Sequence, residues 1–217
     1  MTRHETVRKL IEIGVVPIVR TQSRETALGA ARAVHRGGIG VLEVTMTTPG
    51  ALGVLEQLAD ELGDEMLLGA GTVLDPETAR ACMLAGARFI VTPGLNPRTI
   101  EICKRYSVAA LPGALTPTEV INAWDAGADL VKVFPVDNMG GPAYIKALKA
   151  PLPQIDLVPT GGVDAGNLAD FLRAGASAVA VGSSLMKTAA LKEGRYDAIE
   201  EAAREFLRLV ALARNAA

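Results

Sequence analysis

Short apolar runs alternate along the chain with longer segments in which apolar residues recur at helical spacing. Eight of these runs are nearly continuous, a pattern typical of parallel strands that are covered by helices. We predict strands at Val15–Arg20, Val41–Thr45, Leu67–Thr72, Phe89–Pro93, Ala109–Pro112, Leu130–Pro135, Leu157–Thr160 and Ala178–Gly182. The sequence therefore predicts a strand followed by a helix, repeated eight times without a low-complexity linker.

Residues that favour helix ends mark the boundaries of the predicted helices. Four starts combine an N-cap residue with a first-turn proline or glutamate: Ser23-Arg24-Glu25, Asp75-Pro76-Glu77, Asn96-Pro97 and Thr116-Pro117-Thr118-Glu119. Three exits carry a glycine that can adopt the left-handed conformation, namely Gly86, Gly127 and Gly175. Further helices are expected at Glu5–Ile13, before the first strand, and at Asp197–Arg214.

Eight such units in 217 residues predict an α/β protein with one domain at 1–217, a (β/α)₈ TIM barrel with an extra N-terminal helix. With 49% hydrophobic residues, the chain can bury a substantial core. A doubly wound sheet is the alternative. That fold usually has a Gly-x-Gly-x-x-Gly turn after its first strand, where this chain has Arg20-Thr21-Gln22-Ser23, so the barrel is favoured.

Composition and charge restrict the classes of partner. The formal net charge is −2 and both signs are spread along the chain, so nucleic acid is not an expected partner. No apolar stretch approaches a membrane span, and the residues after Met1 lack the apolar core of a signal peptide. We therefore expect a cytoplasmic protein without membrane association. Cys82 and Cys103 lack ligand-like spacing and are expected to be packed free thiols.

The predicted sixth strand contains Lys132 within an otherwise apolar run. A lysine in a water-poor pocket has its ammonium form destabilised, which leaves more neutral amine to attack a carbonyl group. The structural alternative is a lysine whose stem crosses the apolar layer while its head reaches solvent. Strand alternation directs Lys132 and Glu43 into the same barrel interior. A buried acid and base in one place favour catalysis over a structural ion pair.

Small residues end the predicted seventh and eighth strands, where this barrel usually binds phosphate. Thr160-Gly161-Gly162 and Gly182-Ser183-Ser184 offer backbone amides that an anion can approach, and short helices beginning near Ala165 or Asn167 are expected behind them. A tight turn would explain either loop alone, but the two together predict a phosphate site. Thr72 and Pro93, at the ends of two other strands, complete the rim of the same face.

Six strings, taken in order, resemble the 2-keto-3-deoxy-6-phosphogluconate (KDPG) aldolase family, which also acts on 4-hydroxy-2-oxoglutarate (KHG). They are Leu42-Glu43-Val44-Thr45, Gly69-Ala70-Gly71-Thr72-Val73, Val91-Thr92-Pro93-Gly94, Leu111-Pro112-Gly113, Lys132-Val133-Phe134-Pro135 and Pro159-Thr160-Gly161-Gly162-Val163. The resemblance spans nearly the whole chain. It implies a (β/α)₈ barrel, a homotrimer and a class I aldolase that uses no metal or cofactor.

The resemblance also implies roles for individual residues. Lys132 stands at the family's Schiff-base lysine, Glu43 at its general acid/base, and Thr72 and Pro93 at its pyruvate-side contacts, with Thr160 expected to contact substrate beside them. The phosphate-binding loops correspond to Gly161, Gly162, Gly182, Ser183 and Ser184. Many members carry an arginine where this chain has Thr47. We hypothesise that Arg20 takes over that anion contact; the alternative is an Arg20 paired with a neighbouring carboxylate.

The expected reaction is cleavage of KDPG to pyruvate and glyceraldehyde 3-phosphate, and KHG is a further candidate substrate. Whether the chain instead cleaves the phosphogalactonate epimer remains open, because residue spacing does not determine which configuration at C4 is accepted. A metal-dependent epimerase or isomerase would need ligands at the rim, whereas His4 and His35 lie in predicted helices away from it. A non-catalytic barrel scaffold is a further alternative, against which the presence of both Lys132 and Glu43 argues.

Overall fold

A computed structural model describes residues 1–215 of the chain, in which strands and helices alternate. The strands are β1 (Val15–Val19), β2 (Val41–Thr45), β3 (Leu67–Gly71), β4 (Phe89–Val91), β5 (Ala109–Leu111), β6 (Gly113–Ala114), β7 (Val131–Val133), β8 (Leu157–Pro159) and β9 (Val179–Val181). The helices are α1 (Arg3–Ile13), α2 (Arg24–Arg36), α3 (Ala51–Leu62), α4 (Pro76–Leu84), α5 (Pro97–Arg105), α6 (Pro117–Asp125), the 3₁₀ helix η1 (Asp137–Met139), α7 (Pro142–Lys149), α8 (Leu168–Arg173), α9 (Thr188–Glu193) and α10 (Tyr196–Asn215).

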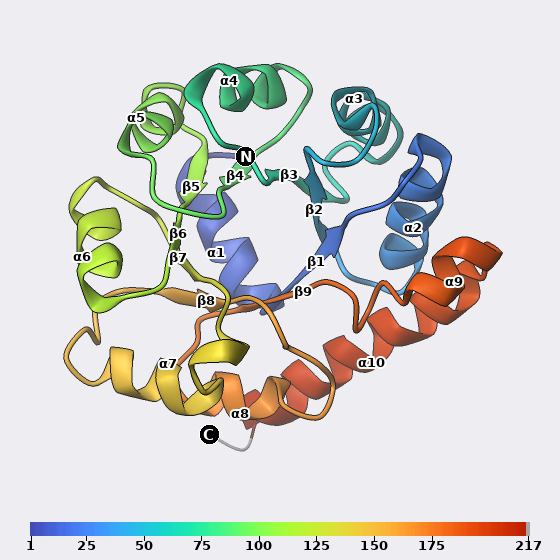
Figure 1. Ribbon diagram of the computed structural model, residues 1–217. Coiled ribbons are helices and arrows are strands. Elements are labelled where there is room, and N and C mark those ends of the chain that lie inside the picture. Colours follow the sequence, from blue (N-terminus) through green and yellow to red (C-terminus); the bar gives the residue numbers. More distant parts are fainter. Residues whose placement is uncertain (216–217) are drawn as a thin grey trace.

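The strands form two parallel sheets, of order β5-β4-β3-β2-β1-β9 and β6-β7-β8. Only Pro112 separates β5 from β6; because proline has no N–H to donate, the ladder is interrupted there. An isolated parallel bridge links Thr160, which follows β8, to Ala180 in β9. In Figure 1 the strands of both sheets follow one another around a common centre with most helices outside, an arrangement that we call the strand ring. The α/β class is confirmed and the arrangement is barrel-like, but the strand ladders are not continuous around the ring.

Every predicted strand is found, but most are shorter than predicted at their carboxyl ends. Strand β1 ends one residue before Arg20, β3 one residue before Thr72 and β8 one residue before Thr160. The predicted strand Leu130–Pro135 is reduced to Val131–Val133. Five of the residues lost from the strand ends are among those predicted to bind the substrate or its phosphate group, namely Arg20, Thr72, Pro93, Thr160 and Gly182.

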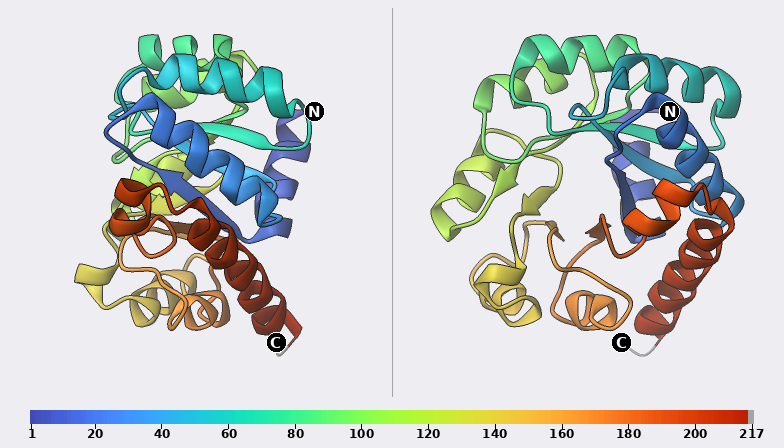
Figure 2. Two further views of the ribbon diagram at one scale, coloured as in Figure 1. Left: turned by 90° about the vertical axis from the view of Figure 1, so that its right-hand side faces the viewer. Right: turned by 45° about the vertical axis from the view of Figure 1, so that its right-hand side comes forward.

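The first and last helices differ from those between strands. Helix α1, the predicted extra N-terminal helix, contacts β1 and β5 and crosses the middle of the strand ring in Figure 1. It leads directly into β1 through Gly14, so it covers the end at which the strands begin. Helix α10 packs along α2 and α8, and Figure 2 shows it extending along one side of the molecule. No helix within residues 1–215 combines the length and apolar character needed to span a lipid bilayer.

The helix boundaries follow the predicted caps. Ser23, Asp75, Asn96 and Thr116 are N-caps whose side chains accept hydrogen bonds from backbone N–H groups in the first turn. Gly86, Gly127 and Gly175 follow the C-caps with φ of +101°, +95° and +99°, which a residue with a Cβ rarely adopts. These local signals therefore determine where the chain leaves each helix for the next strand.

Both cysteines are buried free thiols, as predicted. Burial raises the pKa of Cys82 to about 11 and that of Cys103 to about 12. Neither thiol is therefore ionised near neutral pH, which is the state of structural rather than reactive cysteines.

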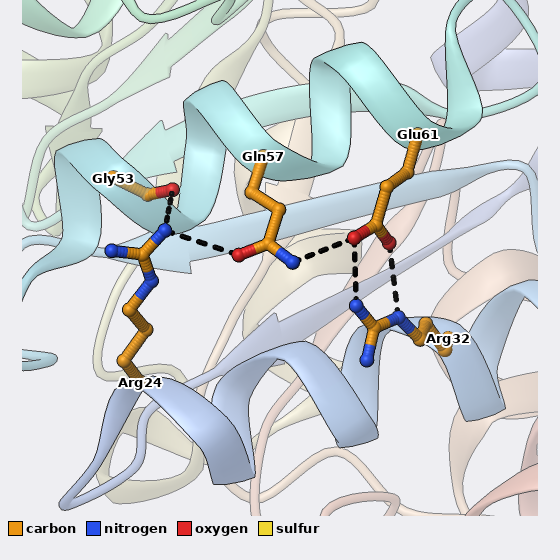
Figure 3. A network of polar contacts seen from close by, with 5 residues as sticks. All are labelled: Arg24, Arg32, Gly53, Gln57 and Glu61. Atoms are coloured by element: carbon orange, nitrogen blue, oxygen red, sulfur yellow. Dashed lines mark hydrogen bonds and ion pairs between the residues drawn. The ribbon is translucent and has the colours of Figure 1, made fainter.

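A polar network connects α2 and α3 across their exposed faces (Figure 3). Arg24 Nη2 donates to the Gly53 carbonyl and to Gln57 Oε1, at 3.2 and 3.0 Å. Gln57 donates to Glu61, whose two oxygens accept from Arg32 at 2.7 and 3.0 Å. These hydrogen bonds hold the pKa of Glu61 below its ordinary value. Exposed ion pairs contribute little stability, so this network mainly fixes how the two helices lie against each other.

Candidate active site

Glu43 in β2 and Lys132 in β7 are the buried acid and base of the strand ring, with exposed fractions of 1% and 6%. The register pairs Glu43 with Gly69, and the Glu43 carboxylate lies against Gly71 further along β3. A Cβ at Gly71 would stand only 1.8 Å from Glu43 Oε1. The side chain of Glu43 thus occupies space that exists because β3 carries glycine there. Gly69 makes equivalent room for the ring of Phe89.

The electrostatic environment of Glu43 is set by burial and two cations. Burial raises the pKa of Glu43 above its ordinary value, and the positive charges of Lys132 and then Arg20 oppose that shift. The effect of Lys132 is coulombic, without a hydrogen bond to the carboxylate. The structure therefore brings the two predicted catalytic residues into electrostatic contact. A carboxylate whose pKa is raised is a stronger base than an exposed one.

The Lys132 amine also lies over an aromatic ring. Its Nζ is 4.9 Å from the centroid of Phe134, two residues further along the chain, which suits a cation–π contact. Phe134 is 36% exposed, whereas Lys132 is buried. Sequence reasoning included Phe134 in the strand but did not select it as a site residue; its position at i+2 from the lysine was the available signal.

Arg20 lies exposed at the end of β1 and turns toward β3, with Nη2 donating to Thr72 Oγ1 at 3.4 Å. Within residues 1–215 it forms no ion pair with a carboxylate, which disfavours the alternative of a structural pair. Thr72 has φ of +58°, a left-handed conformation that is uncommon for a residue with a Cβ. Thr47, at the position of the expected arginine, is exposed and shares a hydrogen bond of 3.0 Å with Thr45.

Pro93 and Thr160 occupy neighbouring parts of the same rim. The Pro93 backbone packs so closely against Gly113 that a Cβ there would be 2.3 Å away. Thr160 is buried, and its backbone N–H donates to Val133 at 2.9 Å while its carbonyl accepts from Val136 at 3.0 Å. Thr160 thus connects β8 to the chain on both sides of the Phe134 position.

The two predicted phosphate loops lie next to each other. Gly161 and Gly162 have φ of +96° and +68°, so both need the freedom of glycine. Ser184 Oγ donates to the Val163 carbonyl at 2.7 Å, which links the loop after β9 to the loop after β8. Gly182 and Ser184 are half-buried, and Ser183 is exposed. Helix α8 begins at Leu168 with Asn167 as its N-cap residue, whose side chain donates to the Gly162 carbonyl at 2.8 Å.

Asp137 is a neighbour of this loop that sequence reasoning missed. Its Cβ would be 2.4 Å from a Cβ at Gly162, and its Oδ1 would be 3.3 Å from one at Gly161. The exposed Asp137 side chain therefore packs on the face of the glycine turn. No local sequence signal shows this contact, because it depends on the packing of η1 against the end of β8.

Within residues 1–215, no group of three or more His, Cys, Asp and Glu side chains is placed to hold a metal ion. His4 is in α1, and His35 in α2 lies 3.3 Å from Glu65, away from the rim.

Comparisons with known proteins agree with the family resemblance seen in the sequence. The family model described as KDPG and KHG aldolase matches residues 7–202. The 2-dehydro-3-deoxy-phosphogluconate aldolase of Treponema pallidum is 35% identical over 93% of this chain and 95% of its own length. The 2-dehydro-3-deoxy-6-phosphogalactonate aldolase of Escherichia coli K12 is 36% identical over 81% of this chain and 86% of its own length.

A solved structure of KDPG aldolase from Legionella pneumophila, with pyruvate captured as a covalent carbinolamine intermediate, superposes with a TM-score of 0.85. It is 31% identical, and the match covers 92% of this chain and 96% of that one. The similarity thus extends over the strand ring, the rim and the surrounding helices alike.

Proposed function

The chain belongs to the KDPG and KHG aldolase family, and from this premise we propose that it is a class I aldolase. It cleaves 2-dehydro-3-deoxy-6-phosphogluconate to pyruvate and glyceraldehyde 3-phosphate, and it also accepts 4-hydroxy-2-oxoglutarate, which yields pyruvate and glyoxylate. The observation that carries the proposal is the burial of Lys132 beside Glu43 at the centre of the strand ring. A covalent pyruvate intermediate in a relative of the same fold supports it.

The proposal includes the architecture and assembly. Two features support closure of the two sheets into one (β/α)₈ barrel: β5 continues into β6 after the single residue Pro112, and a bridge joins Thr160 to Ala180. The whole chain, 1–217, acts as one aldolase domain, and family resemblance supports a homotrimer.

In the first step, the Lys132 amine adds to the C2 ketone of the substrate. Glu43, a base strengthened by burial, first takes one proton from the Lys132 ammonium group, which frees the amine, and later returns that proton to the departing hydroxyl. The other proton of the leaving water passes from the attacking nitrogen to the former ketone oxygen. Loss of water leaves a protonated imine between Lys132 and C2. The imine withdraws electrons more strongly than the original ketone, which prepares the adjacent carbon–carbon bond for cleavage.

In the second step, the Glu43 carboxylate takes the proton of the C4 hydroxyl. The C3–C4 bond breaks, its electron pair moves to the imine nitrogen, and glyceraldehyde 3-phosphate leaves as an aldehyde. The enamine that stays on Lys132 is protonated at C3, and water then hydrolyses the imine to release pyruvate. Glu43 thus moves protons in both directions, which suits a carboxyl group with a raised pKa.

The surrounding residues hold the two ends of the substrate. We assign the substrate carboxylate to the Arg20 guanidinium, whose position beside Thr72 supports this, with Pro93 and Thr160 shaping the pyruvate side. The phosphate at the far end binds backbone amides of Gly161, Gly162, Gly182 and Ser184 and the hydroxyl of Ser183. The contact between Ser184 and Val163 keeps these two loops together.

Reductive trapping tests the covalent step. The protein is incubated with pyruvate and borohydride, digested, and examined by mass spectrometry. We expect the mass of one carboxyethyl group on the peptide that contains Lys132. The Lys132→Met variant should carry none, and a Lys146→Met variant, which alters an exposed lysine of α7, should be labelled like wild type. An unlabelled Lys132 peptide in the wild-type protein would exclude the mechanism.

The phosphogalactonate epimer is a second candidate substrate, favoured by the 36% identity to the E. coli aldolase for that compound. The two substrates differ in configuration at C4, the atom whose hydroxyl meets Glu43. Parallel turnover assays with both epimers and with 4-hydroxy-2-oxoglutarate identify the preferred substrate by its kcat/KM. A higher value for the galactonate would replace the first assignment while leaving the Schiff-base mechanism intact.

A further inference from the structure

A cavity of about 710 Å³ lies at the opposite end of the strand ring from Lys132 and the glycine loops. We call it the basal cavity. It is formed by the start of α1, by α4, by the end of α5, and by the segments that precede β4 and β5. Arg88 directly precedes β4, whereas Thr92 and Pro93 of the rim follow that strand, so the strand separates the two sites. The volume is in the range of sites that hold small molecules.

The charge of the basal cavity is one-sided. Arg3, Arg80, Arg88 and Lys104 contribute to its lining, and none of the lining residues is an aspartate or glutamate. This is unusual in a chain whose formal net charge is −2. A set of cations that face one cavity repel each other, and the repulsion is relieved when an anion enters.

Most of these cations are not neutralised within the protein. Arg3 lies 3.4 Å from Asp129, but Arg80, Arg88 and Lys104 form no ion pair with a carboxylate in the part of the chain that the structure describes. Lys104 is in the last turn of α5, where the negative end of the helix dipole compensates its positive charge. This compensation does not apply to Arg80 or Arg88, because the last turn of α4 has no basic residue.

One arginine is positioned by an aromatic contact. The Arg80 guanidinium carbon lies 3.8 Å from the centroid of the Tyr106 ring, a close cation–π geometry. Tyr106 comes from the end of α5 and is 46% exposed. The stacking restricts the orientation of Arg80 while leaving its N–H groups free to donate. A guanidinium held in this way loses less side-chain entropy when it binds an anion.

We propose that the basal cavity binds a small molecule that carries two or more phosphoryl groups. Arg80 and Arg88 provide two planar forks that match phosphate oxygens, and Arg3 is part of the same lining. A single monoanion would leave most of these cations uncompensated. Nucleotides and bisphosphorylated metabolites share the required chemistry. The site is independent of the proposed aldolase reaction and does not include its residues.

Isothermal titration calorimetry with pyrophosphate, and separately with ATP, tests this proposal at low ionic strength. We expect saturable binding that the Arg88→Ala variant weakens about tenfold or more, as expected for loss of a charge-assisted hydrogen bond. Arg105→Ala is the matched control, because Arg105 is an exposed α5 arginine that pairs with Glu101 and does not line the cavity. Its affinity should stay within about twofold of wild type.

The glycine loops of the rim are the competing location for a phosphate. Binding that survives in a Gly162→Ala variant but is lost in Arg88→Ala supports the basal cavity. Binding that is lost in Gly162→Ala and unchanged in Arg88→Ala overturns the proposal, as does a wild-type protein that binds neither compound. Thermal melting of each variant verifies folding.

Discussion

Replacement of Gly71 by alanine tests whether the position of Glu43 controls the reaction. The added Cβ would be 1.8 Å from Glu43 Oε1, 2.4 Å from its Cδ and 2.6 Å from its Cγ, whereas real Cβ contacts stay above about 3.0 Å. Oε1 must therefore retreat by at least about 1.2 Å, the difference between these two values. The φ of Gly71 is not in the left-handed region, so the backbone itself accepts alanine.

The burial of the Glu43 carboxylate determines how much stability and activity the Gly71→Ala substitution should cost. With Glu43 only 1% exposed, the displaced group moves against packed neighbours, which should cost about 1–3 kcal/mol of stability. A misplacement of about 1 Å at a reacting group costs roughly 100-fold in rate. We therefore expect kcat for KDPG cleavage to fall by about two orders of magnitude. Borohydride should still trap pyruvate on Lys132 after long incubation, although more slowly, because Glu43 also transfers protons while the imine forms.

The assay couples pyruvate release to lactate dehydrogenase, with borohydride trapping of pyruvate as the second measurement. Gly94→Ala is the matched control, since a Cβ at that exposed rim glycine has nothing within 4 Å. A folded Gly71→Ala protein whose kcat stays within about threefold of wild type would refute the assignment of Glu43 as the proton-transfer group. Loss of trapping along with activity would instead indicate general damage to the site.

Three further predictions concern single residues. Burial raises the pKa of Glu43, so its protonated form contributes stability that is complete below the ordinary value of 4.5 and is lost as pH rises through the higher folded-state value. The melting temperature of the neutral Glu43→Gln variant, relative to that of wild type, should therefore increase as the pH is raised from about 4 to 8. A melting-temperature difference that does not change with pH would contradict the raised pKa of Glu43. Arg20→Ala should raise KM for KDPG about tenfold or more with a smaller change in kcat, whereas an unchanged KM would remove Arg20 from the site. Gly162→Ala forces a Cβ to within 2.4 Å of Asp137 at a φ of +68°, so it should raise KM for KDPG and spare the unphosphorylated KHG; equal losses for both substrates would argue against a phosphate loop there.

The order of elements and the ends of the helices were predictable from the sequence, because both depend on local chemistry. The apolar runs located the strands, and caps such as Asp75 and Thr116 form their hydrogen bonds within one turn. The proximity of Glu43 and Lys132 was predictable in outline, since alternation along two strands of a barrel decides which residues face inward. The strand ends were less predictable, because residues such as Thr72 leave the ladder to face the rim.

Tertiary structure alone decided the features that depend on approach between distant segments. The space that Gly71 leaves for Glu43, the contact of Asp137 with the glycine loop and the stacking of Arg80 on Tyr106 each join elements with no local relationship. The basal cavity is a further example, since its cations come from α1, α4 and α5 and from the segment before β4. Sequence patterns determine the individual helices and strands through interactions within a few residues. Distances between elements depend instead on how their side chains fill the space between them, and a pattern along one chain does not encode that volume.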